Sequence, residues 1–143
     1  MQFGYDLIRQ GKYNSAASVL VLAVRQNPND AHARVLLAHA FYLGGNFAKA
    51  STEFSNVYRL QGLSVDDHFL YGRALSKAGR LEQAIDVLTN LVDQRPDFHK
   101  ARVELIKAYS LSGFTDHARE QCNAGMKLAK TDAEYKQFQS LLP

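Results

Sequence analysis

The side chains best suited to acid–base or metal chemistry are five histidines, spread along the chain at positions 32, 39, 68, 99 and 117. His32 and His39 would share one face of a helix, but two turns, about 10 Å, would separate them. That distance is too long for both to bind one metal ion. No His-Glu-x-x-His motif is present. We therefore expect no metal site, no catalytic residue, no cofactor and no enzyme activity.

Two other features could carry chemistry. The single cysteine, Cys122, occupies an apolar helical position, so we expect a buried structural thiol rather than a reactive one. The segment from Gly72 to Gly79 has neither the glycine spacing nor the Lys-Ser/Thr ending of a phosphate-binding loop. Any function must therefore come from surfaces that other elements position.

Those elements are copies of one unit. Gly11, Gly45, Gly79 and Gly113 are spaced 34 residues apart. An alanine follows each glycine five residues later, at Ala16, Ala50, Ala84 and Ala118. Apolar positions repeat with the same period, one set being Phe3, Leu37, Tyr71 and Leu105. A period this strict indicates a repeat architecture.

Within each unit the apolar residues follow the i, i+3, i+4, i+7 spacing of an amphipathic helix. The spacing and the breaks at Gly and Pro predict helices over residues 2–10, 14–26, 31–43, 47–60, 65–78, 81–94, 98–112, 115–129 and 132–142. We expect each periodic glycine to end a helix in the left-handed conformation. We expect the periodic alanines to lie where two helices cross closely.

This pattern resembles the tetratricopeptide repeat family along nearly the whole chain. The resemblance implies an all-α fold, a right-handed α-solenoid of about four helix-turn-helix units in a single domain, 1–143. The units would span 1–30 (incomplete), 31–64, 65–98 and 99–132, followed by a capping helix over 132–142. Three residues depart from the aromatic usual early in the first helix: Arg34, His68 and Arg102. Gly125, inside a predicted helix, is expected to make room for Ile106.

In tetratricopeptide arrays the first helix of each unit lines the concave face. The resemblance therefore places an apolar ladder at Val35, Phe69 and Val103. One helical turn further on comes a polar ladder of Tyr5, His39, Arg73 and Lys107. A third row contains His32, Asp66 and Lys100, and a fourth contains Leu43, Lys77 and Leu111 with Tyr42 beside it.

We expect this groove to hold a peptide or helix of a partner protein, with Phe69 and Arg73 as its main anchors. Aromatic and arginine side chains dominate interface energetics, and the arginine fork binds a carboxylate through two hydrogen bonds. A ligand with hydrophobic and acidic residues would suit such a groove. The chain would then be a non-catalytic scaffold or adaptor.

Two other function classes stay open. The chain could be a structural subunit that self-associates through its uncapped first helix, since open ends of repeat arrays favour head-to-tail contacts. Less favoured is an RNA-binding array, because the groove offers at most one pair of aromatics for base stacking. The net charge of +3 is too small to indicate nucleic acid.

The first unit lacks four residues of the repeat before Met1, which suggests an excised domain or a truncated chain. No apolar run approaches the roughly 20 residues that span a bilayer, so we expect no membrane insertion. No signal peptide is visible, which favours the cytoplasm; removal of an upstream segment would leave the periplasm open.

Overall fold

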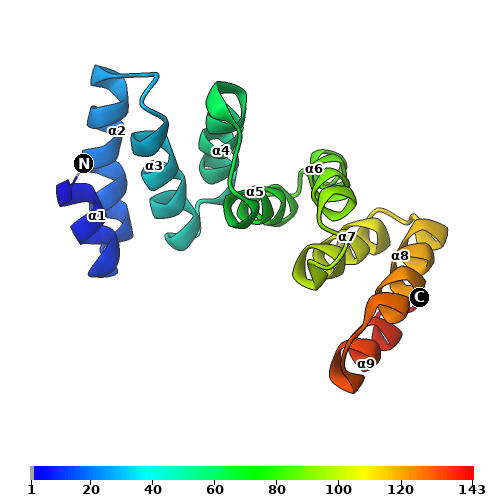
Figure 1. The fold of residues 1–143 in the computed structure, drawn as a ribbon. Helices are drawn as coiled ribbons and strands as arrows, with labels where there is room; N and C mark the ends of the chain where they lie inside the picture. Colours follow the sequence, from blue (N-terminus) through cyan, green and yellow to red (C-terminus); the bar gives the residue numbers. More distant parts are fainter. Residues whose placement is uncertain (1) are drawn as a thin grey trace. The chain divides into compact units, whose positions relative to one another are not determined.

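The computed structural model describes residues 2–143, which form nine α-helices and no strand (Figure 1). The helices are α1 Gln2–Arg9, α2 Tyr13–Gln26, α3 Ala31–Leu43, α4 Phe47–Gln61, α5 Val65–Lys77, α6 Leu81–Gln94, α7 His99–Leu111, α8 Thr115–Leu128 and α9 Asp132–Ser140. Each predicted helix is confirmed. The largest difference is the end of the last helix, at Ser140 rather than at residue 142.

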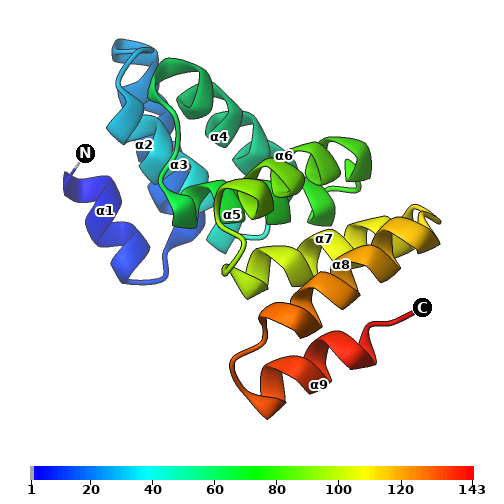
Figure 2. The ribbon, with the colours of Figure 1, turned by 45° about the vertical axis from the view of Figure 1, so that its right-hand side comes forward.

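The helices form two compact units, Met1–Ala78 and Gly79–Pro143. In the N-terminal unit, α1 packs on α2, α2 on α3, α3 on α4 and α4 on α5. In the C-terminal unit, α6 packs on α7, α7 on α8 and α8 on α9 (Figure 2). Each helix thus packs against its sequence neighbour within the unit, as expected for helix-turn-helix repeats. That the two units together form a single domain, 1–143, stays a prediction.

The repeat landmarks have the predicted roles. Gly11, Gly45, Gly79 and Gly113 all have φ between +75° and +82°, in the left-handed region that glycine enters without steric cost. The four periodic alanines are fully buried, because a larger side chain would separate the crossing helices. Asp30, Asn46 and Ser64 cap α3, α4 and α5 through side-chain oxygens that accept backbone N–H groups.

One apolar position of the repeat lies outside the core. Phe3 belongs to the same periodic set as Leu37 and Leu105, which are buried, yet 63% of Phe3 is exposed. Leu37 shares a core cluster with residues of α2, the helix that precedes its own. Among residues 2–143, no helix packs against α1 as α2 packs against α3, and Phe3 is exposed there.

The arginines that replace the usual aromatic make a repeated polar contact. Arg34 donates from Nε to the Pro28 carbonyl at 2.7 Å and pairs through a terminal nitrogen with Glu53 at 2.8 Å. Arg102, two repeats later, donates to the Pro96 carbonyl at 3.0 Å and to Gln121 on α8. Each guanidinium therefore joins the loop before its helix to the helix after it.

A phenylalanine from α9 completes the core of the C-terminal unit. Phe138 is fully buried in a cluster with Val103, Ile106 and Cys122. A Cβ placed on Gly125 would lie only 2.5 Å from the Phe138 ring. Gly125 therefore makes room for Phe138, whose ring, rather than Ile106, supplies the atoms nearest to the added Cβ. The last helix, α9, therefore packs against α8 at Gly125, where any larger residue would meet the Phe138 ring.

Candidate functional site

The predicted groove residues divide between the two units. The N-terminal unit contains ten of them: Tyr5, His32, Val35, His39, Tyr42, Leu43, Asp66, Phe69, Arg73 and Lys77. The C-terminal unit contains Lys100, Val103, Lys107 and Leu111, all on α7. We call the surface formed by α1, α3 and α5 in the N-terminal unit the first-helix face.

Two predicted residues line a hollow on the first-helix face. Tyr5 and Gln2 from α1 and His32 and Leu36 from α3 surround a volume of about 450 Å³. Tyr5 is 44% exposed and His32 is exposed, whereas Leu36 is buried and forms an apolar surface beneath them. This volume lies within the range typical of ligand-binding clefts. The hollow presents an aromatic ring, an imidazole and an amide around an apolar base.

A polar pair joins α3 to α5 on the same face. The Nε2 of His39 lies 2.7 Å from Oδ1 of Asp67, and the His39 ring contacts Phe54 with centroids 5.9 Å apart. An ionised carboxylate only accepts hydrogen bonds, so Nε2 carries the proton. His39 is therefore partly buried on this face, and its Nε2 already has an intramolecular partner in Asp67.

The His39–Asp67 pair should make stability depend on pH. The hydrogen bond from His39 holds the pKa of Asp67 below its ordinary value near 3.8, although burial opposes the shift. A depressed carboxyl pKa stabilises the fold above the unfolded-state pKa, and this contribution is lost as pH falls through the folded-state pKa. We expect Asp67→Asn to be less stable than wild type at neutral pH, with the difference shrinking below about pH 5.

Urea unfolding at a series of pH values measures this difference. Asp66→Asn is the matched control, because Asp66 is the adjacent carboxylate and is exposed. A gap between wild type and Asp67→Asn that stays constant down to pH 2 would contradict the assignment.

The end of α3, the start of α4 and the end of α5 form an aromatic and cationic cluster. The rings of Tyr42 and Phe47 meet edge to face at 5.3 Å, and the Lys77 ammonium lies 5.0 Å from the Phe47 centroid. Leu43, beside them, is 49% exposed. Cation–π contacts of this kind hold a lysine in place without neutralising its charge. Lys77 is thus oriented and still exposed.

The remaining predicted groove residues differ in how far their side chains are exposed. Phe69 and Arg73 are half-buried on α5, while Asp66 is exposed. On α7, Lys100, Lys107 and Leu111 are exposed.

Val103, predicted to be an exposed apolar rung, is buried, and that prediction is wrong. It packs in the cluster that contains Phe138, because α9 brings an aromatic ring against this part of the C-terminal unit.

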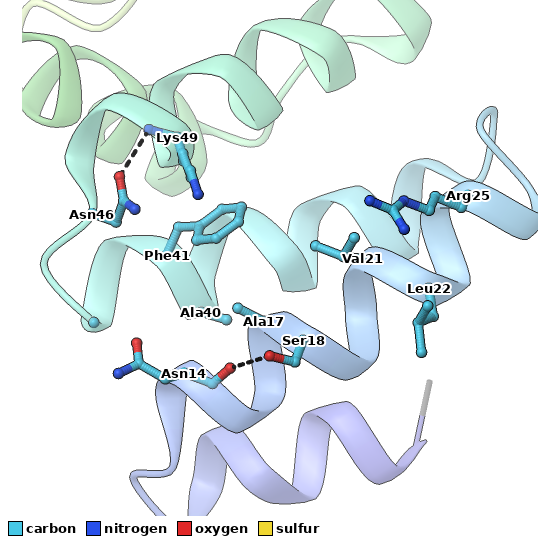
Figure 3. A pocket seen from close by; sticks show the side chains of 11 residues that line it. Asn14, Ala17, Ser18, Val21, Leu22, Arg25, Ala40, Phe41, Asn46 and Lys49 are labelled. Atoms are coloured by element: carbon cyan, nitrogen blue, oxygen red, sulfur yellow. Dashed lines mark hydrogen bonds between the residues drawn. The ribbon is translucent and has the colours of Figure 1, made fainter.

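A second hollow lies outside every predicted site. It opens between α2 and α4 with α3 beneath, and it is lined by side chains that include Val21, Arg25, Phe41 and Lys49 (Figure 3). Its volume is about 500 Å³. The available sequence signal was the pair of small residues Ala17 and Ala40 on facing helices, which leaves space where two larger side chains would close it.

The described residues contain no cluster of three His, Cys, Asp or Glu side chains that could hold a metal ion. Among residues 2–143, no helix has the length and apolar character to cross a membrane. Cys122 is fully buried, which confirms the expected structural thiol, and burial raises its pKa. A buried thiol with a raised pKa is a poor nucleophile.

Two family profiles match the sequence. One is described as anaphase-promoting complex, cyclosome, subunit 3, and covers residues 9–91. The other is described as tetratricopeptide repeat and covers residues 75–142. A search of curated proteins gives no match.

Several solved structures share the fold. A crystal structure of MamA is 18% identical with a TM-score of 0.84, covering 99% of this chain and 83% of that one. YrrB, described as a TPR protein with an unusual peptide-binding site, is 17% identical with a TM-score of 0.79, covering 99% and 73%. MamA from Desulfovibrio magneticus RS-1 is 19% identical with a TM-score of 0.79, covering 98% and 87%. At these identities the similarity shows the fold.

Proposed function

Because the chain belongs to the tetratricopeptide repeat family, whose members mediate protein–protein interactions, we propose that it is a non-catalytic adaptor that binds a segment of a partner protein on its first-helix face. The observation that carries this proposal is the hollow lined by Tyr5, His32 and Leu36. It combines an exposed aromatic ring, hydrogen-bonding side chains and an apolar base. Such a combination is typical of a surface that anchors one side chain of a ligand.

The face favours a ligand with both apolar and acidic residues. Tyr5, Leu36 and the half-buried Val35 offer apolar contacts near one end of the face. Lys77, oriented over Phe47, offers a positive charge on α5. The exposed Lys77 ammonium would attract a carboxylate of the ligand to this end of the face.

The test begins with a peptide-display selection on the folded wild-type chain. The affinity of the selected peptides is then measured for wild type, Tyr5→Ala and Tyr135→Ala. Tyr135 is the matched control, because it is also 44% exposed but lies on α9. We expect Tyr5→Ala to weaken binding by about tenfold or more, as for an aromatic anchor, and Tyr135→Ala to have little effect.

Peptides that bind Tyr5→Ala as tightly as wild type would refute the first-helix face as the site. If no peptide binds and the chain forms concentration-dependent oligomers, the self-association alternative is favoured instead. The exposed Phe3 on α1 is the residue that would support such a contact.

A further inference from the structure

The hollow between α2 and α4 continues into a second one, and together they form what we call the second-helix groove. The first part has a volume of about 500 Å³ and the second about 360 Å³. Four residues line both parts: Val21, Arg25, Phe41 and Lys49. The groove lies entirely within the N-terminal unit and uses none of the residues predicted for the first-helix face.

Small residues create this space. Ala17 on α2 and Ala40 on α3 are buried, so neither fills the gap between the second helices of the two repeats. Leu37 and Phe41 on α3 form an apolar floor, and Val21 and Leu22 form the wall on α2. Leu22 is 58% exposed and extends the apolar surface of this wall.

The rim of the groove carries positive charge. Lys49 lies with its ammonium 5.6 Å from the centroid of Phe41, and Arg25 extends from α2 across from it (Figure 3). Glu53, the acidic residue of the second part, is bound by Arg34 at 2.8 Å. The local balance is therefore two cations beside an apolar floor.

The fold does not require this chemistry, as the second unit demonstrates. Two 34-residue repeats further on, Ile85 replaces Ala17, Asp93 replaces Arg25 and His117 replaces Lys49. Tyr109, the counterpart of Phe41, contacts the His117 ring at 5.2 Å. At the equivalent repeat positions the C-terminal unit thus has a larger side chain, a carboxylate and an imidazole ring. Of these two positions, the one in the N-terminal unit has the small side chain and the two cationic side chains.

We propose that the second-helix groove is a separate binding site for an acidic segment of a partner protein, with an aromatic side chain inserted on Phe41 and carboxylates paired with Arg25 and Lys49. Phe41 offers the ring surface for an offset or edge contact. The arginine fork and the lysine ammonium lie on opposite sides of the insertion point, so acidic residues on both sides of the aromatic one meet a cation. The site would allow the chain to hold two partner segments at once, one on each face.

The test uses a fluorescein-labelled peptide with one phenylalanine flanked on each side by two glutamates, titrated into the full chain. We expect saturable binding that weakens about tenfold in the Arg25→Asp, Lys49→Glu double variant, because two attractions become repulsions. Binding should also weaken as salt rises from 50 to 300 mM, since exposed charges are screened. The Arg59→Asp, Lys127→Glu variant has the same net charge, and Arg59 lies in the last turn of α4 as Arg25 lies in the last turn of α2. This variant should bind like wild type.

Amide chemical-shift mapping with the same peptide locates the site. Shifts grouped at Val21, Phe41 and Lys49, and unchanged by Tyr5→Ala, support the proposal. Shifts grouped at Tyr5 and His32 would overturn it while leaving the first-helix face in place. No saturable binding at millimolar peptide, or equal losses in both charge variants, would overturn it as well.

Discussion

Replacing Phe138 by alanine is expected to lower the free energy of unfolding by about 3–5 kcal/mol and to release α9 from the C-terminal unit. The ring is fully buried against Val103, Ile106 and Cys122, and its edge meets His99 at 5.4 Å. No other residue of α9 is buried, so this ring carries most of the apolar contact that holds the helix. Urea unfolding gives the loss in stability, and faster amide exchange in α9 would report its release.

Gly125 makes the same contact testable by a double-mutant cycle. Gly125→Ala in the wild-type background should be destabilising, because the new methyl group would meet the Phe138 ring. In the Phe138→Ala background that obstruction is absent, so the same substitution should stabilise by up to about 1 kcal/mol through helix propensity. The sign of the effect therefore reverses between backgrounds.

A Gly125→Ala change with the same sign in both backgrounds would show that the glycine is not reserved for Phe138. In that case the position of α9 would have to depend on other contacts, such as the 3.4 Å approach of His99 to Glu134.

Replacing Arg102 by methionine is expected to cost about 2–3 kcal/mol. Arg102 is buried, and its two terminal nitrogens donate to Gln121 and to the Pro96 carbonyl. Burial lowers the pKa of this guanidinium, but arginine stays charged at neutral pH. Methionine fills a similar space without donors, so it leaves a loop carbonyl and an amide without their charged partner.

Arg119→Met is the matched control in the same unit. Arg119 is about half exposed and pairs with Asp116 one turn away, a surface ion pair worth at most about 1 kcal/mol. Urea midpoints for the two variants should therefore differ clearly. Equal midpoints would mean that the Arg102 contacts contribute no more than a surface pair. Arg102→Lys should also lose stability, because a single ammonium cannot reproduce the two-sided fork.

The sequence alone determined the positions of the helices, turns and helix crossings, because each depends on a local physical requirement. A left-handed helix end favours glycine wherever it occurs, and a close helix crossing needs alanine, so Gly11 and Ala16 and their repeats located the turns and crossings. Helical spacing of apolar residues located the helices to within two residues. Each of these signals lies within a single repeat and recurs every 34 residues along the chain.

Only the tertiary structure decided which surfaces are covered and which are open. Phe3 and Leu37 occupy the same place in the repeat, yet one is exposed and the other buried, because burial depends on the neighbouring helix. Val103 is likewise hidden by a cluster that includes a residue from α9. The second-helix groove arises from small side chains on α2 and α3 that are about 23 residues apart, Ala17 and Ala40, and their shared space exists only once the helices pack. The periodic sequence determined the repeats, whereas the packing of the helices determined which side chains come together around a hollow.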